Sequence, residues 1–285
     1  MYLKRKADAY LNAWKSDPNR SPLIIKGPRQ VGKTETIDYF AAHNYRSVVE
    51  INFVEEPKYR AITADGYGAD TIVRNISLIN PAKKFIPGDT LIFFDEIQAH
   101  PDIVTALKFF KIDGKYDVIC SGSMLGISYK QIESNSVGYK TDYEMRSLDF
   151  EEFLWARGYD EAVIESMFTH LCDATPFSEV EMNVFSTAFM DYCVLGGMPA
   201  VVASHIRTGT FEGTLQLQRQ LIWTTRRISA NTRKDSIRHE FSTCSTIFPC
   251  NSPRKTRSSK SARLPAERVS KTIEDAWNGL KPREW

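Results

Sequence analysis

One loop of eight residues constrains the fold of this chain more than any other feature of its sequence. Residues 27–34 spell Gly-Pro-Arg-Gln-Val-Gly-Lys-Thr, which fits the pattern G-x-x-x-x-G-K-[ST]. In such a loop the glycines let consecutive backbone N–H groups turn toward phosphates, the lysine reaches the terminal phosphates, and the Thr hydroxyl faces magnesium. The loop needs a strand before it and a helix after it. The motif therefore predicts a strand–loop–helix unit.

The flanks of the loop have the patterns that this unit requires. Residues 22–26 form a short apolar run, and residues 35–42 place Ile37, Phe40 and Ala41 at helical spacing. The alternative, a glycine turn that binds nothing, lacks this arrangement. The predicted nucleotide-binding residues are Gly27, Pro28, Arg29, Gln30, Val31, Gly32, Lys33 and Thr34.

A second motif supplies carboxylates. The apolar run at residues 91–94 ends in Asp95 and Glu96. A buried strand of this kind delivers one carboxylate to magnesium, while a second carboxylate can orient or deprotonate an attacking water. We predict that Asp95 and Thr34 are the metal residues and that Glu96 is the catalytic residue. Acidic pairs at strand ends also serve as helix caps, and the phosphate-binding loop favours the first interpretation.

Hydroxyl residues end a third strand-like run. Residues 117–123 read Asp-Val-Ile-Cys-Ser-Gly-Ser, and Ser121 is the candidate for a polar sensor that contacts the terminal phosphate or the water, with Ser123 second. The alternative is a turn that uses Ser and Gly for their conformational preferences. Arg146 and Arg157 are candidates for an arginine finger, or else surface residues in ion pairs.

The order of apolar patterns predicts the fold class. Strand patterns at residues 22–26, 47–53, 90–95, 116–121 and 143–148 alternate with helical patterns at residues 35–42, 70–79 and 103–110, after a helical stripe at residues 2–15. Such alternation predicts an α/β domain with a mostly parallel sheet and helices on both faces. Residues 149–157 predict a further helix, residues 124–139 a loop, and residues 159–221 a helical region. We place a domain boundary near Gly158.

Composition narrows the class of protein. A formal net charge of +2 gives no general bias toward nucleic acid, and the 42% of hydrophobic residues is ample for a core. The sequence shows neither a signal-peptide pattern nor an apolar stretch long enough to span a membrane. Five cysteines and five histidines at scattered spacings suggest neither disulfides nor a zinc site. We expect a cytoplasmic protein with no membrane partner.

Five motifs in order resemble those of a known family. They are the loop at residues 27–34, Phe-Phe-Asp-Glu-Ile-Gln at 93–98, Ser-Gly-Ser at 121–123, Leu-Asp-Phe-Glu-Glu-Phe-Leu at 148–154 and Gly-Gly-Met-Pro at 196–199. The chain resembles the AAA-domain ATPases of bacteria and archaea that carry a C-terminal domain of unknown function. The resemblance runs from about Tyr2 to Leu221.

The resemblance implies an AAA-type parallel sheet of five strands with the phosphate-loop strand central, followed by a smaller helical segment. It implies ATP and Mg²⁺ as ligands, with Lys33 and Thr34 at the phosphates and magnesium, Asp95 at magnesium, Glu96 at the water and Ser121 as sensor. The client of this family is largely unassigned, so the resemblance names no target. The expected domains are residues 1–158, 159–222 and 223–285.

The last expected segment departs from the family, whose members continue well past the position of Trp285. From Trp223 onward no helical or strand period is sustained, and we expect low order. A shifted reading frame, with free choice among synonymous codons, yields strings such as D-Y-E-E-D-I-R-K-Y that look like the family's continuation. We therefore hypothesise a frameshift near Ile222. The alternative is a native basic tail whose arginines and lysines between Arg226 and Arg263 pair with phosphates.

These observations leave three functions open. The first is a magnesium-dependent ATPase in which Glu96 positions water. The second is a nucleotide-dependent switch that turns over slowly and acts through a partner protein or self-association. The third is a DNA-associated ATPase whose basic tail holds nucleic acid.

Overall fold

The computed structural model describes residues 1–123 and 138–232, which lie within one compact unit that spans Met1–Lys234. The side chains of Leu171 and of residues 225–232 are outside this description. In chain order the elements are α1 (Lys6–Ser16), β1 (Leu23–Gly27), α2 (Lys33–Asn44), β2 (Ser47–Asn52), η1 (Pro57–Thr63), α3 (Ala69–Ile79), β3 (Thr90–Asp95), η2 (Ile97–Ala99), α4 (Asp102–Asp113), β4 (Asp117–Ser123), β5 (Thr141–Glu144), α6 (Phe150–Ala156), α7 (Glu161–Cys172), α8 (Glu179–Leu195), α9 (Pro199–Thr208) and α10 (Thr214–Thr232).

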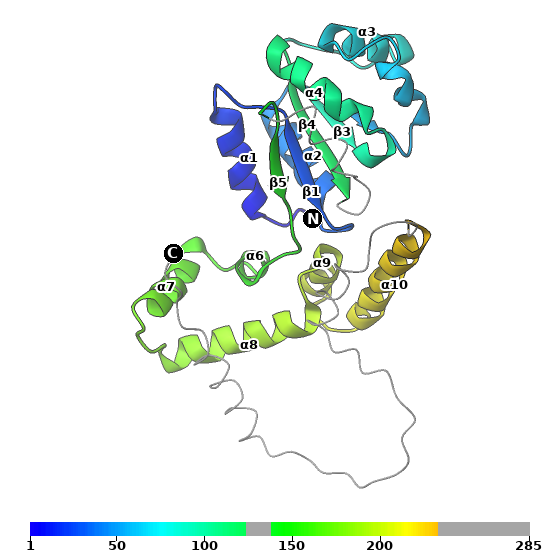
Figure 1. Cartoon of the computed structure of the whole chain (residues 1–285). Helices are drawn as coiled ribbons and strands as arrows, with labels where there is room; N and C mark the ends of the chain where they lie inside the picture. Colours follow the sequence, from blue (N-terminus) through cyan, green and yellow to red (C-terminus); the bar gives the residue numbers. More distant parts are fainter. Residues whose placement is uncertain (124–137, 233–285) are drawn as a thin grey trace. The chain divides into compact units, whose positions relative to one another are not determined.

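The strands form a single five-stranded sheet in the order β2-β3-β4-β1-β5, and every neighbouring pair is parallel. The α/β fold with helices on both faces is therefore confirmed (Figure 1). The middle place belongs to β4, whereas the strand before the phosphate loop, β1, lies between β4 and β5. The expectation of a central β1 was wrong in this detail. Because β1 still has a partner on each side, its carboxyl end is held in the sheet interior.

Two hydrophobic cores cover the two faces of the sheet. Alternate residues of each inner strand enter opposite cores, as the two-residue period of a strand requires. In β3, for example, Leu91 and Phe93 face α1 and α2, while Ile92 and Phe94 face α3 and α4. Since both faces are covered, the inner strands are nearly continuous apolar runs. Because both faces are buried, polar side chains of these strands can gather only at the ends of the strands.

The helices after β5 build two smaller cores of their own. The helix α6 contacts α7, α8 and α9, and its Phe153 and Leu154 are fully buried among their side chains. By its contacts, α6 belongs with the helices that follow it, although it ends at Ala156, before the domain boundary that the sequence predicts near Gly158. At the junction with the sheet, the Leu148 N–H donates to the Gly197 carbonyl at 2.8 Å, and the Tyr192 hydroxyl donates to the Leu148 carbonyl at 2.8 Å.

Two element boundaries differ from the sequence-based expectation. The last strand, β5, spans Thr141–Glu144 and not residues 143–148. The Met145 N–H still donates to the Lys26 carbonyl of β1 at 2.7 Å, whereas Leu148 is buried in a core formed by the helices after β5. The helix α10 continues to Thr232, past the expected boundary at Ile222. The predicted loop at residues 124–139 falls almost wholly outside the described residues, as do Cys244, Cys250 and residues 233–285 of the predicted tail.

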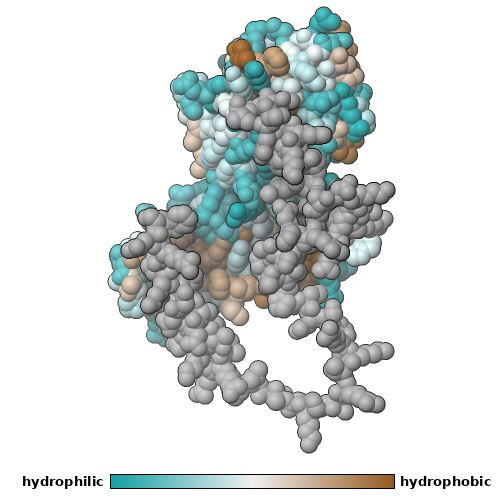
Figure 2. All heavy atoms as spheres, in the orientation of Figure 1, coloured by the Kyte–Doolittle hydropathy of each residue, from teal (hydrophilic) through white to brown (hydrophobic). Residues whose placement is uncertain are grey.

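In the described part of the chain, no helix is both long and apolar enough to cross a lipid bilayer. The helix α8 nevertheless exposes several large apolar side chains, and brown apolar surface is visible in the lower half of Figure 2. These exposed residues of α8 are Val180, Met182, Val184, Phe189, Met190 and Val194.

The contact between Gly197 and Leu148 leads to a stability prediction. A Cβ on Gly197 would stand 2.1 Å from the Leu148 carbonyl oxygen, so Gly197→Ala must push the two backbones apart. We expect this substitution to lower the free energy of unfolding by about 1–3 kcal/mol in urea titrations. Gly68→Ala is the matched control, because a Cβ there meets only Thr71 Oγ1 at 3.5 Å. Equal effects of the two substitutions would contradict this reason.

Candidate functional site

The phosphate-binding loop runs from the end of β1 to the start of α2, as the motif predicts. Gln30 and Gly32 have φ values of 64° and 90°, so two residues of the loop adopt a left-handed backbone conformation before the helix begins. Gly27 is required for a steric reason, because a Cβ there would lie 2.1 Å from the Met145 carbonyl oxygen. The backbone after β5 thus packs directly on the start of the loop. Such a loop at a helix N-terminus is suited to bind an anion.

Lys33, the first residue of α2, folds back over the loop. Its ammonium group donates to the carbonyl oxygens of Gly27 at 3.0 Å and Pro28 at 2.7 Å. Burial lowers the pKa of Lys33, while the nearby carboxylates of Glu96 and Asp95 act in the opposite direction. The side chain therefore stands between the loop and the acidic pair, where a bound phosphate would complete its charge balance.

Asp95 is the polar centre of the site, and its two carboxylate oxygens have separate partners. One oxygen, Oδ2, accepts from Thr34 Oγ1 at 3.2 Å and from Asn52 Nδ2 at 3.3 Å. The other, Oδ1, accepts from the Ser121 hydroxyl and from the Glu96 N–H at 2.9 Å. The carboxyl ends of β2, β3 and β4 and the start of α2 thus meet on one side chain that is 5% exposed.

The pair of Thr34 and Asp95 fits a magnesium ion. Mg²⁺ takes oxygen ligands at about 2.0–2.1 Å in an octahedron, which places adjacent ligand oxygens about 3 Å apart. The 3.2 Å between Thr34 Oγ1 and Asp95 Oδ2 is close to that spacing. The same residues would hold the ion and, at its usual coordination, leave most ligand positions to water and phosphate.

Ser121 occupies a different place from the one expected of a sensor. Its side chain is 1% exposed, and its hydroxyl donates to Asp95 behind the carboxylate. It is not among the residues that line the cavity described below. Ser123 is also buried, and its N–H donates to Gln98 Oε1 at 3.3 Å. The structure therefore brings Ser121 to Asp95, the predicted metal residue, and not to the lining of the cavity.

Glu96 follows Asp95 in a left-handed conformation with a φ of 53°. This turn takes its side chain out of the strand direction, and the Gln98 amide donates to its carboxylate. A non-glycine residue with positive φ is unusual and costs about 1–2 kcal/mol. The local strain is consistent with a side chain held for function.

Lys33, Thr34, Asp95 and Glu96 line one cavity of about 530 Å³, a volume in the range of small-molecule sites. Its lining combines the predicted residues with side chains from α9 and from both the start and the end of the described chain. The lining residues are Met1, Leu3, Arg29, Gln30, Gly32, Lys33, Thr34, Glu35, Asp95, Glu96, Pro199, Ala200, Ala203 and Thr224. The helical region thus closes one side of the loop with small apolar groups.

Neither candidate for an arginine finger lines this cavity. Arg146 is paired with Glu144 at 3.0 Å, and Arg157 is paired with Asp191. Sequence reasoning also missed Asn52 and Gln98. Their positions in the sequence could have indicated them, because Asn52 ends a strand at the same edge of the sheet as Asp95, and Gln98 lies two residues after Glu96.

Comparison with known proteins agrees with this geometry. Residues 19–154 match the model of a family described as an AAA domain. The match contains the phosphate loop, the acidic pair and all five strands, and it supports nucleotide binding and ATPase activity in general. It ends within α6, so it does not test the expected C-terminal region or the frameshift.

No curated protein matches this sequence. Among solved structures, PCH-2 from C. elegans is similar at 10% identity with a TM-score of 0.34. That alignment covers 61% of this chain and 48% of PCH-2, so the chain spans about half the length of that protein. A likeness of this degree says nothing about activity.

The strained backbone of Glu96 leads to a second prediction. Glu96→Gly accommodates a φ of 53° without strain, whereas Glu96→Ala removes the same carboxylate and keeps the strain. We expect the glycine variant to be more stable than the alanine variant by about 1 kcal/mol in urea titrations. A more stable alanine variant would show that Glu96 is not strained in the folded protein.

Proposed function

We propose that this chain binds ATP with magnesium at the Gly27–Thr34 loop and hydrolyses it. The observation that carries the proposal is the meeting of Thr34 with Asp95 at 3.2 Å beside Lys33 in one cavity. A loop that binds phosphate without a metal ion has no need of an acidic strand end aligned with its Thr hydroxyl. The family match over residues 19–154 supports the same conclusion.

Each residue has a role that follows from its position. The loop N–H groups and Lys33 bind the phosphates, and the small apolar groups of Pro199, Ala200 and Ala203 face the same cavity. Thr34 and Asp95 would hold magnesium, which when bound neutralises charge on the phosphates. Ser121 and Asn52 fix the direction of the Asp95 carboxylate by hydrogen bonds.

Glu96 is the proposed base. It lines the cavity and is held by Gln98, so its carboxylate can accept a proton from a water that attacks the terminal phosphorus. The proton passes from water to the carboxylate as the bond from phosphorus to the bridging oxygen breaks. ADP and phosphate are the products.

The test separates binding from turnover. Glu96→Gln keeps the size and the polarity of the side chain and removes its basicity, so we expect turnover to fall about 10²–10⁴-fold while ATP affinity stays near the wild-type value. Lys33→Ala should instead weaken binding. Glu55→Gln, at an exposed carboxylate outside the cavity, is the control. Unchanged turnover in Glu96→Gln would remove Glu96 from the mechanism.

A slow nucleotide-dependent switch is the second candidate, and the cavity lining favours it. Among the described residues that line the cavity, Arg29 is the only arginine, and it belongs to the loop itself. A site without an arginine from elsewhere lacks a source of transition-state stabilisation that fast hydrolases use. Single-turnover rates at saturating ATP decide between the two, since a negligible rate for the wild-type chain favours the switch.

A partner protein or a second copy of the chain fits the switch, and exposed apolar residues on α8 offer a surface of suitable chemistry. The DNA-associated alternative depends on basic residues most of which lie outside the described residues, and it stays a prediction.

A further inference from the structure

Arg5 is a buried arginine that sequence reasoning did not single out. Its side chain is 4% exposed although it stands only four residues from the start of the chain. A buried guanidinium needs partners for its charge and its N–H groups. Its partners lie on two segments that are far apart in the sequence, the phosphate-binding loop and residues 146–152. The role of Arg5 follows from what these segments do.

The first partner is the phosphate-binding loop. Arg5 Nη1 donates to the Val31 carbonyl oxygen at 2.7 Å. In a trans peptide the carbonyl and the following N–H point in opposite directions. Because the Val31 carbonyl faces Arg5, the Gly32 N–H faces away from it, and Gly32 lines the cavity. Among the described residues, none accepts a hydrogen bond from this N–H.

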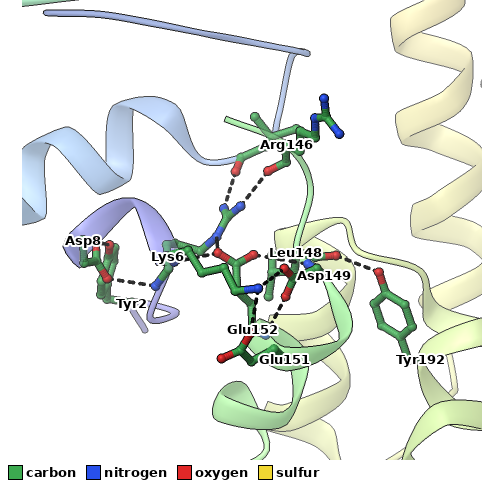
Figure 3. Close-up of polar contacts among 11 residues, drawn as sticks. Tyr2, Lys6, Asp8, Arg146, Leu148, Asp149, Glu151, Glu152 and Tyr192 are labelled. Carbon is green, nitrogen blue, oxygen red and sulfur yellow. Dashed lines mark hydrogen bonds and ion pairs between the residues drawn. The ribbon is translucent and has the colours of Figure 1, made fainter. Parts of the chain in front are cut away.

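The other partners lie where the sheet meets the helical region. Arg5 Nη2 donates to the Arg146 carbonyl at 2.6 Å, and Arg5 Nε lies 3.2 Å from Glu152 Oε1. Glu152 is 5% exposed. Figure 3 shows Arg146, Asp149 and Glu152 around this meeting point, with Lys6 beside them.

Glu152 is itself fixed by the backbone. It accepts from the Lys6 N–H at 2.7 Å and from the Asp149 N–H at 3.2 Å, the second bond being part of the capping box that starts α6. The Glu152 carboxylate can therefore hold Arg5 only when α6 is docked against α1. Because Arg5 contacts both Glu152 and Val31, the position of α6 affects the position of the guanidinium at the loop.

We infer that Arg5 is a positioning residue for the phosphate-binding loop: it orients the Val31–Gly32 peptide so that the Gly32 N–H faces the phosphates, and its ion pair with Glu152 makes this orientation depend on α6. The inference rests on the proposed ATP site. It assigns to the N-cap residue of α1 a function in nucleotide affinity. Arg5 itself stays outside the cavity and takes no part in the chemistry.

The test uses a double variant that keeps the fold. Removing Arg5 alone would leave Glu152 buried and unpaired, which is strongly destabilising, whereas replacing both charges by neutral groups is often tolerated. Arg5→Met with Glu152→Gln removes the donors to Val31 and the buried charges, and the single amide oxygen of Gln still accepts from one of the two N–H groups, of Lys6 or Asp149, that bond to Glu152. We expect its Kd for ATP to rise about tenfold or more, with its urea midpoint near that of the wild type.

The control variant is Lys6→Ala. Lys6 is the next residue and forms ion pairs with Asp149 and Glu151, but these are partly exposed and its ammonium group does not contact the loop. We expect this variant to bind ATP like the wild type. An equal loss of affinity in Lys6→Ala would show that general disturbance of α1, and not the Arg5 contact, weakens binding.

The Gly32 amide gives a readout that a purely structural role would not move. In ¹⁵N-edited NMR spectra of the wild-type chain, we expect its proton to shift downfield when ATP is added, and to shift less in the double variant at saturating ATP. The inference is overturned if a wild-type chain that binds ATP shows no such shift, or if the folded double variant binds with wild-type affinity. A wild-type chain that does not bind ATP removes the proposed function instead.

Discussion

The structure depends on a parallel sheet that is buried on both faces. Alternate side chains of β1, β3 and β4 fill two separate cores, so the faces of these strands have no room for polar groups. Polar side chains can then collect only where the strands end. Asn52, Asp95 and Ser121 all stand at or near the carboxyl ends of their strands, and the phosphate loop leaves the sheet at the same edge.

Asp95 shows how this edge becomes a site. A carboxylate that is 5% exposed must have its oxygens satisfied, and four groups from three strand ends and a helix start donate to it. The hydrogen bonds set the direction of the oxygen that faces Thr34. A small change in the register of β3 would therefore lose the alignment with the loop, and the complete pairing of β3 with β2 along its length protects it.

The helical region is tied to this site by backbone contacts and one buried ion pair. Gly197 packs on Leu148, Tyr192 donates to the Leu148 carbonyl, and Arg5 joins Glu152 to the loop. These contacts place the first turns of α9 at the wall of the cavity. A short path of hydrogen bonds through Arg5 and Glu152 thus joins the loop to α6.

The sequence by itself determined the loop, the acidic strand and the order of strands and helices, because each of these is a local pattern. The bounds of β3 agree with its apolar run, and α2 and α4 extend only a few residues beyond their predicted cores. Local pattern misplaced β5, since Leu148 looks like a strand residue but is buried in a core formed by the helices after β5. Tertiary structure alone decided that Ser121 sits behind Asp95 and that Arg5 reaches Val31, 26 positions along the chain. Such partners are set by how buried layers pack, which no short stretch of sequence encodes.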